Sequence, residues 1–266
     1  MDYKKNKDIH RMVIKIGTSS LTHSTGNLNY RHIEKMAAVI CDLKNMGYEV
    51  VLVSSGALGV GLGKTNLTQK PAQTAGKRAL AAIGQSSLMA IYDEVFNVYG
   101  CKVSQVLLTK SDVKDDHSRN NIADAFFMLF RYGAIPVVNE NDVVVSDDSF
   151  GDNDTLAAYV AQIIGADLLI IWSDIDGLYN KNPREYPDAK LIPVVKGVTE
   201  DLYKMAGGAG SARGCGGMLT KLNAAAIANQ AGIDMVIANS FRPDDIYELL
   251  CGKSVGTRFK AQKNKA

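Results

Sequence analysis

The sequence predicts an α/β fold with three layers, in which helices cover both faces of a mostly parallel central sheet. Two observations support this prediction. Short apolar runs rich in Val, Ile and Leu recur along the chain, as expected for strands that a parallel sheet buries on both faces. Between these runs lie segments whose apolar residues recur every three or four positions, which is the helical spacing. Repeated strand–helix–strand units of this kind predict parallel strands joined by crossover helices.

The first half of the chain contains the first four strands of this prediction. They are expected at residues 12–16, 49–54, 102–108 and 134–139. Helices are expected between them at 33–43, about 77–99 and 122–130. Glycine follows each helix, at Gly47, Gly100 and Gly133, where it commonly ends a helix.

The second half continues the alternation of helices and strands. It predicts, in order, a helix over 156–164, a strand over 167–172, a helix beginning at 199–201, an alanine-rich helix over about 218–231 and a strand over 234–239. Because no linker or internal repeat divides the chain, we expect one domain over 1–266, with its core at about 10–259.

Composition and charge exclude several classes of protein. The 266 residues carry a formal net charge of +2 and form no basic patch, so we expect neither nucleic acid nor a membrane as a partner. The start of the chain lacks the apolar core of a signal peptide, and glycine and polar residues interrupt the most apolar run, 156–172. The absence of any CxxC pair favours a reducing, cytoplasmic location over a metal or redox centre. The four cysteines are Cys41, Cys101, Cys215 and Cys251.

Short polar segments follow the expected strands or open the expected helices. They are GTSS (17–20), SSGA (54–57), NEND (139–142), GDND (151–154), SD (173–174) and GCGGMLTK (214–221). In open α/β sheets, ligands bind beyond the carboxyl ends of the strands. We therefore expect these segments to line one crevice.

The glycine-rich segment 207–217 indicates a phosphate site. Six of its eleven residues are glycine, and it leads into the start of a helix, where free N–H groups attract anions. A plain surface loop is the alternative, but the other polar segments favour phosphate. The segment 59–65 lacks the first glycine of a P-loop, and GxGxxG, HRD and DFG do not occur. Any nucleotide site in this protein is therefore of a different type from the P-loop, Rossmann and protein-kinase sites.

NEND and GDND place acidic residues and asparagines within a short span. The acidic residues are Glu140, Asp142, Asp152 and Asp154. One interpretation is a polar turn in which Asp152 or Asn153 caps the following helix. The other is a site for a ligand ammonium group or for Mg²⁺. The residues by themselves leave both interpretations open.

Lys15 is unusual for its position, because it lies within an apolar strand, where an unpaired charge is costly to bury. A strand-edge lysine that reaches water is one interpretation. The other places its ammonium group beside a phosphoryl group, together with Lys221 and a carboxylate partner. A catalytic triad based on histidine has little support, since none of the histidines lies near the polar segments. These are His10, His23, His32 and His117.

Six segments together resemble the amino acid kinase family. They are KIGTSSLT, VSSGALGVG, PVVNENDVV, FGDNDTLAAYVA, WSDIDGLYNKNP and GCGGMLTKLNAAAIA. The resemblance runs from about residue 10 to residue 259. The pairing of NEND with GDND is the most specific feature, and it is similar to the glutamate kinases within that family. Many of those proteins carry a C-terminal PUA domain, and we expect this chain to resemble the short form without one.

This resemblance implies ATP-dependent phosphorylation of the γ-carboxylate of L-glutamate, the first step of proline biosynthesis, with ATP and Mg²⁺ as cofactors. It implies that Lys15 and Lys221 neutralise the transferring phosphoryl group and that Asp154 holds both lysines. The implied glutamate-binding residues are Ser55, Asn139, Asp142, Asp152 and Asn153. The implied nucleotide-binding residues are Lys15, Ser173, Asp174, Cys215, Gly216, Gly217, Met218, Leu219, Thr220 and Lys221. No protein ligand to a metal is assigned.

The resemblance also implies partners. Proline is expected as a feedback inhibitor, glutamyl phosphate reductase as a partner, and a homo-oligomer as the assembly. Two alternatives for the activity stay open. One is another phosphotransferase of the family, such as a uridylate or carbamate kinase, and the other is a non-catalytic amino-acid-binding regulator.

Overall fold

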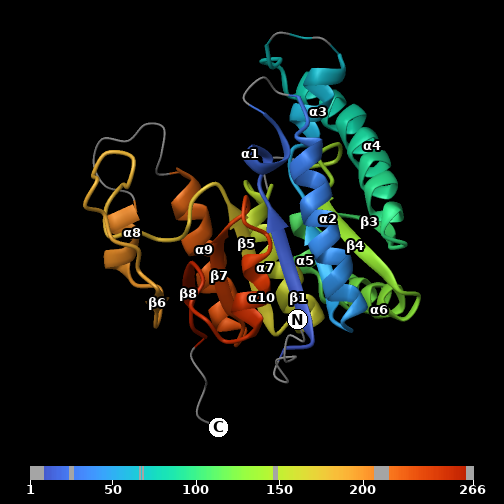
Figure 1. Cartoon of the computed structure of the whole chain (residues 1–266). Helices are drawn as coiled ribbons and strands as arrows, with labels where there is room; N and C mark the ends of the chain where they lie inside the picture. Colours follow the sequence, from blue (N-terminus) through green and yellow to red (C-terminus); the bar gives the residue numbers. More distant parts are fainter. Residues whose placement is uncertain are drawn as a thin grey trace. The chain divides into compact units, whose positions relative to one another are not determined.

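The computed structural model describes residues 9–23, 27–65, 67, 69–145, 149–206 and 216–261 (Figure 1). The chain divides into two compact units. Unit 1 comprises Met1–Lys15 and Asp154–Ala266, and unit 2 comprises Ile16–Asn153. The chain therefore changes unit after Lys15 and again after Asn153.

Unit 2 contains three parallel strands in the order β3-β4-β2. They are β2 (Glu49–Val53), β3 (Lys102–Leu108) and β4 (Ala134–Glu140). In register, Val103 lies opposite Ile135, and Leu52 lies opposite Val137. The central strand β4 is buried from its second residue onward, as its Val-rich and Ile-rich sequence predicts.

Six helices belong to the described part of unit 2. They are α1 (Thr18–Leu21), α2 (Tyr30–Asn45), α3 (Ala57–Lys64), α4 (Thr74–Val98), α5 (Lys110–Lys114) and α6 (Asp116–Arg131). Helices α3 and α4 approach so closely that only glycine fits at their contact. A Cβ on Gly61 would lie 1.9 Å from the carbonyl oxygen of Leu80, and one on Gly84 would lie 1.7 Å from that of Ala57. This contact fixes the position of α4, which carries Gln85.

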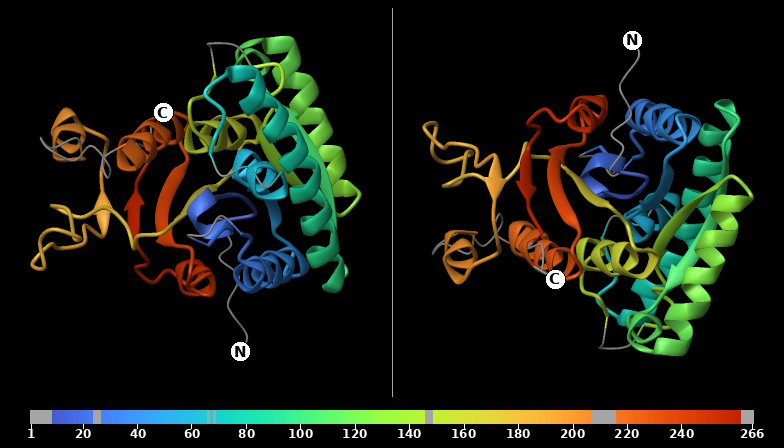
Figure 2. Two further views of the ribbon diagram at one scale, coloured as in Figure 1. Left: turned by 90° about the horizontal axis from the view of Figure 1, so that it is seen from above. Right: turned by 90° about the horizontal axis from the view of Figure 1, so that it is seen from below.

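Unit 1 contains five strands in the order β1-β5-β7-β8-β6 (Figure 2). They are β1 (Arg11–Ile16), β5 (Leu168–Ser173), β6 (Val194–Val195), β7 (Asp234–Asn239) and β8 (Thr257–Phe259). Strands β5 and β7 are parallel, as are β6 and β8, whereas β7 and β8 are antiparallel. The helices are α7 (Asn153–Ile164), α8 (Glu200–Ala206), α9 (Gly216–Gln230) and α10 (Asp245–Leu250). Both β1 and α7 extend one residue across the boundary of the unit.

The strands and helices that the sequence predicts are all present, with ends that differ by a few residues. The short elements α1, α3, α5, α10, β6 and β8 were not predicted. Helix α3 contains three glycines, which weaken helix propensity, so its stability depends on packing against α4. Among the described helices, none combines the length and the apolar character needed to cross a bilayer.

Candidate active site

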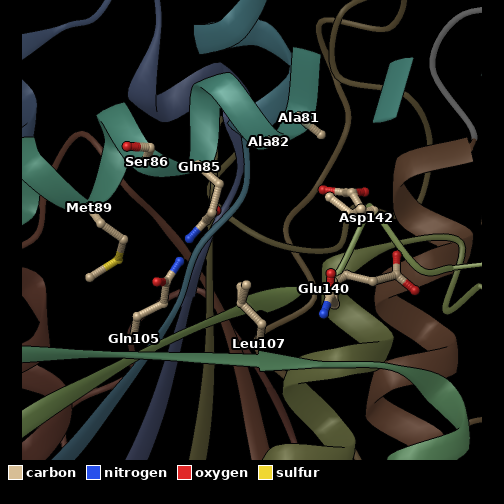
Figure 3. Close-up of a pocket in the computed structure, with 11 residues that line it drawn as sticks. Ala81, Ala82, Gln85, Ser86, Met89, Gln105, Leu107, Glu140 and Asp142 are labelled. Carbon is tan, nitrogen blue, oxygen red and sulfur yellow. The ribbon is translucent and has the colours of Figure 1, made fainter. Parts of the chain in front are cut away.

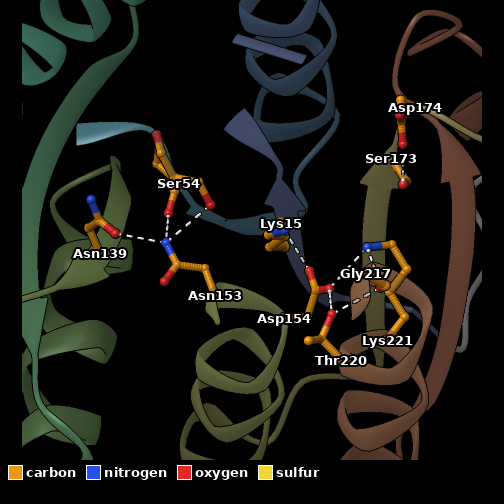
Figure 4. A network of polar contacts seen from close by, with 11 residues as sticks. Lys15, Ser54, Asn139, Asn153, Asp154, Ser173, Asp174, Gly217, Thr220 and Lys221 are labelled. Carbon is orange, nitrogen blue, oxygen red and sulfur yellow. Dashed lines mark hydrogen bonds and ion pairs between the residues drawn. The ribbon is translucent and has the colours of Figure 1, made fainter. Parts of the chain in front are cut away.

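Three charged side chains meet in the interior of unit 1. Lys15 of β1 places its Nζ atom 2.6 Å from Oδ1 of Asp154, at the start of α7. Lys221 of α9 places its Nζ atom 3.0 Å from Oδ2 of the same carboxylate. The three residues are only 7%, 2% and 9% exposed, respectively. Figure 4 shows the two ammonium groups on either side of the Asp154 carboxylate.

Hydrogen bonds fix the lysine–aspartate cluster further. Thr220 donates its hydroxyl hydrogen to Oδ2 of Asp154 at 2.9 Å. Lys221 also donates to the carbonyl oxygen of Gly217 at 3.2 Å, one turn earlier in α9. The first turn of α9 therefore positions Lys221 through its own backbone and through Asp154.

The electrostatics of the cluster favour an anionic ligand. Burial acts to raise the pKa of Asp154, but the adjacent charges of Lys15 and Lys221 outweigh it and hold the pKa below its usual value. Asp154 is thus a carboxylate at neutral pH, and the three side chains together carry one net positive charge. A buried cation cluster of this kind suits a phosphoryl group, which brings the compensating negative charge.

The start of α9 supplies a second contribution to anion binding. This fifteen-residue helix begins at Gly216, and the N–H groups of a helix start and the positive end of its dipole favour an anion near Lys221. Among the residues that the structure describes, none lies within 4 Å of a Cβ added at Gly217. Met218 and Leu219 are half-buried within this turn. Cys215, the remaining member of the predicted segment, lies outside the described residues.

Ser173 and Asp174 follow β5 in unit 1. Ser173 is buried and donates its hydroxyl hydrogen to Oδ1 of Asp174 at 3.3 Å. Its carbonyl oxygen accepts from the backbone N–H of Ser240 at 2.8 Å. Asp174 forms an ion pair with Arg184 at 3.0 Å. The strand end thus presents a hydroxyl and a carboxylate whose positions are fixed by neighbouring groups.

A second polar group, the amide cluster, lies in unit 2 and contains Asn139, Asn153 and Ser55. Nδ2 of Asn153 donates to Oδ1 of Asn139 at 2.8 Å and to Oγ of Ser55 at 3.1 Å. The same nitrogen donates to the carbonyl oxygen of Ser54. Asn139 in turn donates through its Nδ2 to Oε1 of Gln85 at 2.8 Å. Figure 4 shows Asn153 between Asn139 and the end of β2.

A pocket of about 400 Å³ opens beside this amide cluster within unit 2, in the size range of small-ligand sites. Helix α4 forms one wall and β3 another, and the end of β4 closes a third side (Figure 3). Its polar lining includes Gln85, Gln105, Glu140, Asn141 and Asp142. Its apolar lining includes Met89 and Leu107.

Two acidic residues in this pocket have different environments. The Glu140 carboxylate accepts from the backbone N–H of Phe150 at 2.9 Å and from Oγ of Ser149 at 3.0 Å. Burial raises the pKa of Asp142, and the charge of Glu140 raises it further. A ligand ammonium group would relieve this repulsion and stabilise Asp142 as a carboxylate.

The structure groups the predicted site residues into two sets. Lys15, Asp154 and Lys221 meet in unit 1, and Ser55, Asn139 and Asn153 meet in unit 2. Asp142 lies in the pocket wall, and Asp152 is half-buried before α7. Sequence reasoning missed Gln85 and Gln105. The sequence offers no signal for Gln85, which reads as an ordinary glutamine within a long helix.

Several curated proteins with similar sequences are described as glutamate 5-kinases. The chain is 48% identical over 265 residues to a glutamate 5-kinase of Clostridium perfringens (strain 13 / Type A), with 98% of both chains covered. It is 50% identical over 255 residues to a glutamate 5-kinase of Caldanaerobacter subterraneus subsp. tengcongensis, covering 96% of this chain and 68% of that one.

Solved structures share the fold at low sequence identity. Carbamate kinase from Giardia lamblia bound to AMP-PNP superimposes with a TM-score of 0.69 at 19% identity, covering 95% of this chain and 99% of that one. An isopentenyl phosphate kinase from T. acidophilum gives a TM-score of 0.68 at 16% identity, covering 94% and 100%. These similarities confirm the predicted α/β fold with its mostly parallel sheet. Residues 10–239 match the model of the amino acid kinase family, and the chain belongs to that family.

Proposed function

We propose that this protein transfers the γ-phosphoryl group of ATP to the γ-carboxylate of L-glutamate, giving L-glutamyl 5-phosphate and ADP as the first step of proline biosynthesis. The buried cluster of Lys15, Asp154 and Lys221 carries this proposal, because it suits a transferring phosphoryl group. The similarity to glutamate 5-kinases over nearly the whole chain supports the choice of acceptor.

The reaction needs charge neutralisation more than it needs a general base. The glutamate side chain has a reference pKa of about 4.3, so it is already a nucleophilic anion at neutral pH. Its approach to the anionic phosphate is opposed by charge repulsion. Lys15 and Lys221 offset that repulsion, and Asp154 keeps both ammonium groups in place while the bond to the leaving ADP oxygen breaks.

The residues of unit 2 are proposed to bind glutamate. Asp142 would accept from its ammonium group, since a positive charge there relieves the repulsion from Glu140. Ser55, Asn139 and Asn153 would supply neutral hydrogen-bonding groups. Asp152, directly before α7, would lie beside this set.

The residues of unit 1 are proposed to bind ATP. The start of α9 would receive the phosphates, and Ser173 and Asp174 would contact another part of the nucleotide. The proposed substrate is MgATP, in which Mg²⁺ is held mainly by phosphate oxygens and water. Among the described residues, no three His, Cys, Asp or Glu side chains are grouped so that they could hold a metal ion.

The proposal includes the cellular setting and partners. We place the protein in the cytoplasm, with glutamyl phosphate reductase consuming the labile acyl phosphate. Proline would compete with glutamate, because it carries the same ammonium and α-carboxylate groups on one carbon. A homo-oligomer is proposed as the working assembly.

The decisive experiment is transfer from MgATP to glutamate with hydroxylamine present, which traps acyl phosphate as a hydroxamate. We expect hydroxamate to form with L-glutamate and in step with ADP. Phosphorylation of UMP or carbamate instead of glutamate would overturn the proposed acceptor. Glutamate binding without ADP release would identify a regulator instead of an enzyme.

A further inference from the structure

Two backbone groups fix the orientation of three side-chain amides in unit 2. The carbonyl oxygen of Ser54 can only accept, so the atom of Asn153 facing it is the NH₂ group. The backbone N–H of Glu140 can only donate, and it lies 3.0 Å from Asn139, so the atom of Asn139 facing it is Oδ1. The Asn139 oxygen therefore accepts from both Glu140 and Asn153.

This orientation continues to Gln85. Because Oδ1 of Asn139 faces Glu140 and Asn153, its Nδ2 is the atom that lies 2.8 Å from Gln85. An NH₂ group can only donate, so the atom of Gln85 that receives it is Oε1. The NH₂ group of Gln85 is thereby turned away from Asn139. Gln85 itself lines the pocket, and Figure 3 shows its nitrogen directed toward Gln105, another residue of the pocket lining.

The pocket thus presents opposite polarities to a ligand. Asp142 offers a carboxylate that accepts hydrogen bonds, and Gln85 offers an NH₂ group that donates them. An α-amino acid carries an ammonium and a carboxylate on the same carbon, so it matches a donor and an acceptor that line one pocket. A second function follows for Gln85, since its Oε1 keeps Asn139 and Asn153 in the orientation described above.

We propose that Gln85 is a positioning and specificity residue of the amino-acid site, whose NH₂ group donates to the α-carboxylate of the substrate while its Oε1 orients Asn139. This inference rests on the proposed function, because it assigns a contact within the proposed glutamate site. It predicts discrimination between L-glutamate and 4-aminobutyrate. The latter keeps the ammonium and the reacting carboxylate but lacks the α-carboxylate.

The test compares Gln85→Glu with Gln85→Met, with L-glutamate as the substrate and 4-aminobutyrate as a competitive inhibitor. A carboxylate at this position still accepts from Asn139, but it repels the α-carboxylate of glutamate. We expect Gln85→Glu to raise the KM for glutamate at least about tenfold, with kcat changed less than about threefold, since a hydrogen bond between charged groups is replaced by repulsion. The inhibition constant of 4-aminobutyrate should change by less than about threefold, because that ligand lacks the repelled group.

Gln85→Met removes both the donor and the acceptor, so it should weaken both ligands and lower kcat as Asn139 and Asn153 lose their orientation. Gln162→Met, an exposed glutamine of α7, is the matched control and should match the wild type. Circular dichroism and the unfolding midpoint establish that each variant is folded.

The outcomes separate the two proposals. Absence of hydroxamate with the wild type would overturn the proposed function and the role of Gln85 together. Wild-type activity with an equal loss of glutamate and 4-aminobutyrate affinity in Gln85→Glu would overturn the role of Gln85 alone, leaving a purely structural residue. A loss confined to glutamate supports the inference.

Discussion

Asp154 can hold two lysines because each of its oxygens faces a different ammonium group, Lys15 at Oδ1 and Lys221 at Oδ2. Removing Asp154 would leave two buried like charges close together, and breaking a buried pair in this way typically costs about 3–5 kcal/mol of stability. Lys221 can be removed more safely, because Asp154 keeps its pairing with Lys15. Replacement of Lys221 therefore tests its role in catalysis with less risk of unfolding the protein than replacement of Asp154.

Lys221→Ala should lower kcat about 10²- to 10³-fold, the usual effect of removing one group that stabilises charge in a transition state. The KM for glutamate should stay within about threefold, because Lys221 is assigned to the phosphoryl group. Steady-state hydroxamate assays measure both constants. Lys204→Ala, which removes an exposed lysine of α8, is the control. An unchanged kcat in Lys221→Ala would remove this residue from the reaction.

Asp142→Asn should raise the KM for glutamate about tenfold, since a hydrogen bond to a charged group is exchanged for a neutral one. The fall in kcat should be small, because Asp142 lies in the pocket wall and not in the lysine–aspartate cluster. The measurement is the dependence of initial rate on glutamate concentration. A normal KM would assign the ammonium group to another residue.

The same residue predicts a pH dependence. Burial and Glu140 raise the pKa of Asp142, so it becomes neutral at a higher pH than an ordinary aspartate. Affinity for the ammonium group needs the charged form, so the KM for glutamate should rise as the pH falls toward this raised pKa. The KM of Asp142→Asn should lack this rise. Parallel pH profiles for the two proteins would show that another group titrates.

At the scale of helices and strands, close packing determines features that the periodicity of the sequence does not predict, such as the helix α3 and its contact with α4. The Val-rich and Ile-rich strands and the longer helices were predictable, because their apolar pattern follows from which face is buried. Helix α3 was not, since its glycines read as a loop until the contact with α4 explains them. Lys15 was identifiable as a charge in an apolar strand, whereas Gln85 was not, because its partner Asn139 is 54 residues away.

Gly84→Ala tests the α3–α4 contact. Its Cβ would lie 1.7 Å from the carbonyl oxygen of Ala57, so the helices must move apart, at a typical cost of about 1–3 kcal/mol. Urea unfolding should show this loss, and the KM for glutamate should rise because Gln85 follows directly in α4. Gly59→Ala is the control, since its Cβ meets only ordinary contact with Thr18 at 3.8 Å. Equal stability of Gly84→Ala and the wild type would contradict the close contact.

At the scale of the whole molecule, the exposed apolar surface of unit 2 predicts self-association. Strand β3 is an edge strand. Among the described residues, it pairs with β4 on one side and has no partner strand on the other. The helices α4 and α6, which pack against β3 and β4, expose large apolar side chains near their ends. These include Val98, Tyr99, Phe127, Met128 and Tyr132. An unpaired edge strand flanked by apolar side chains is a typical surface for pairing with a second copy.

Light scattering after size-exclusion chromatography should therefore give a multiple of the 28.7 kDa chain mass. Phe127→Glu should shift the mass toward the monomer, because a charge would be buried at the pairing surface. Phe241→Glu is the matched control, since Phe241 is a similarly exposed phenylalanine in unit 1. A wild-type mass of one chain would refute self-association. If the multimer persists in Phe127→Glu, the exposed surface of α6 does not form the contact between the chains.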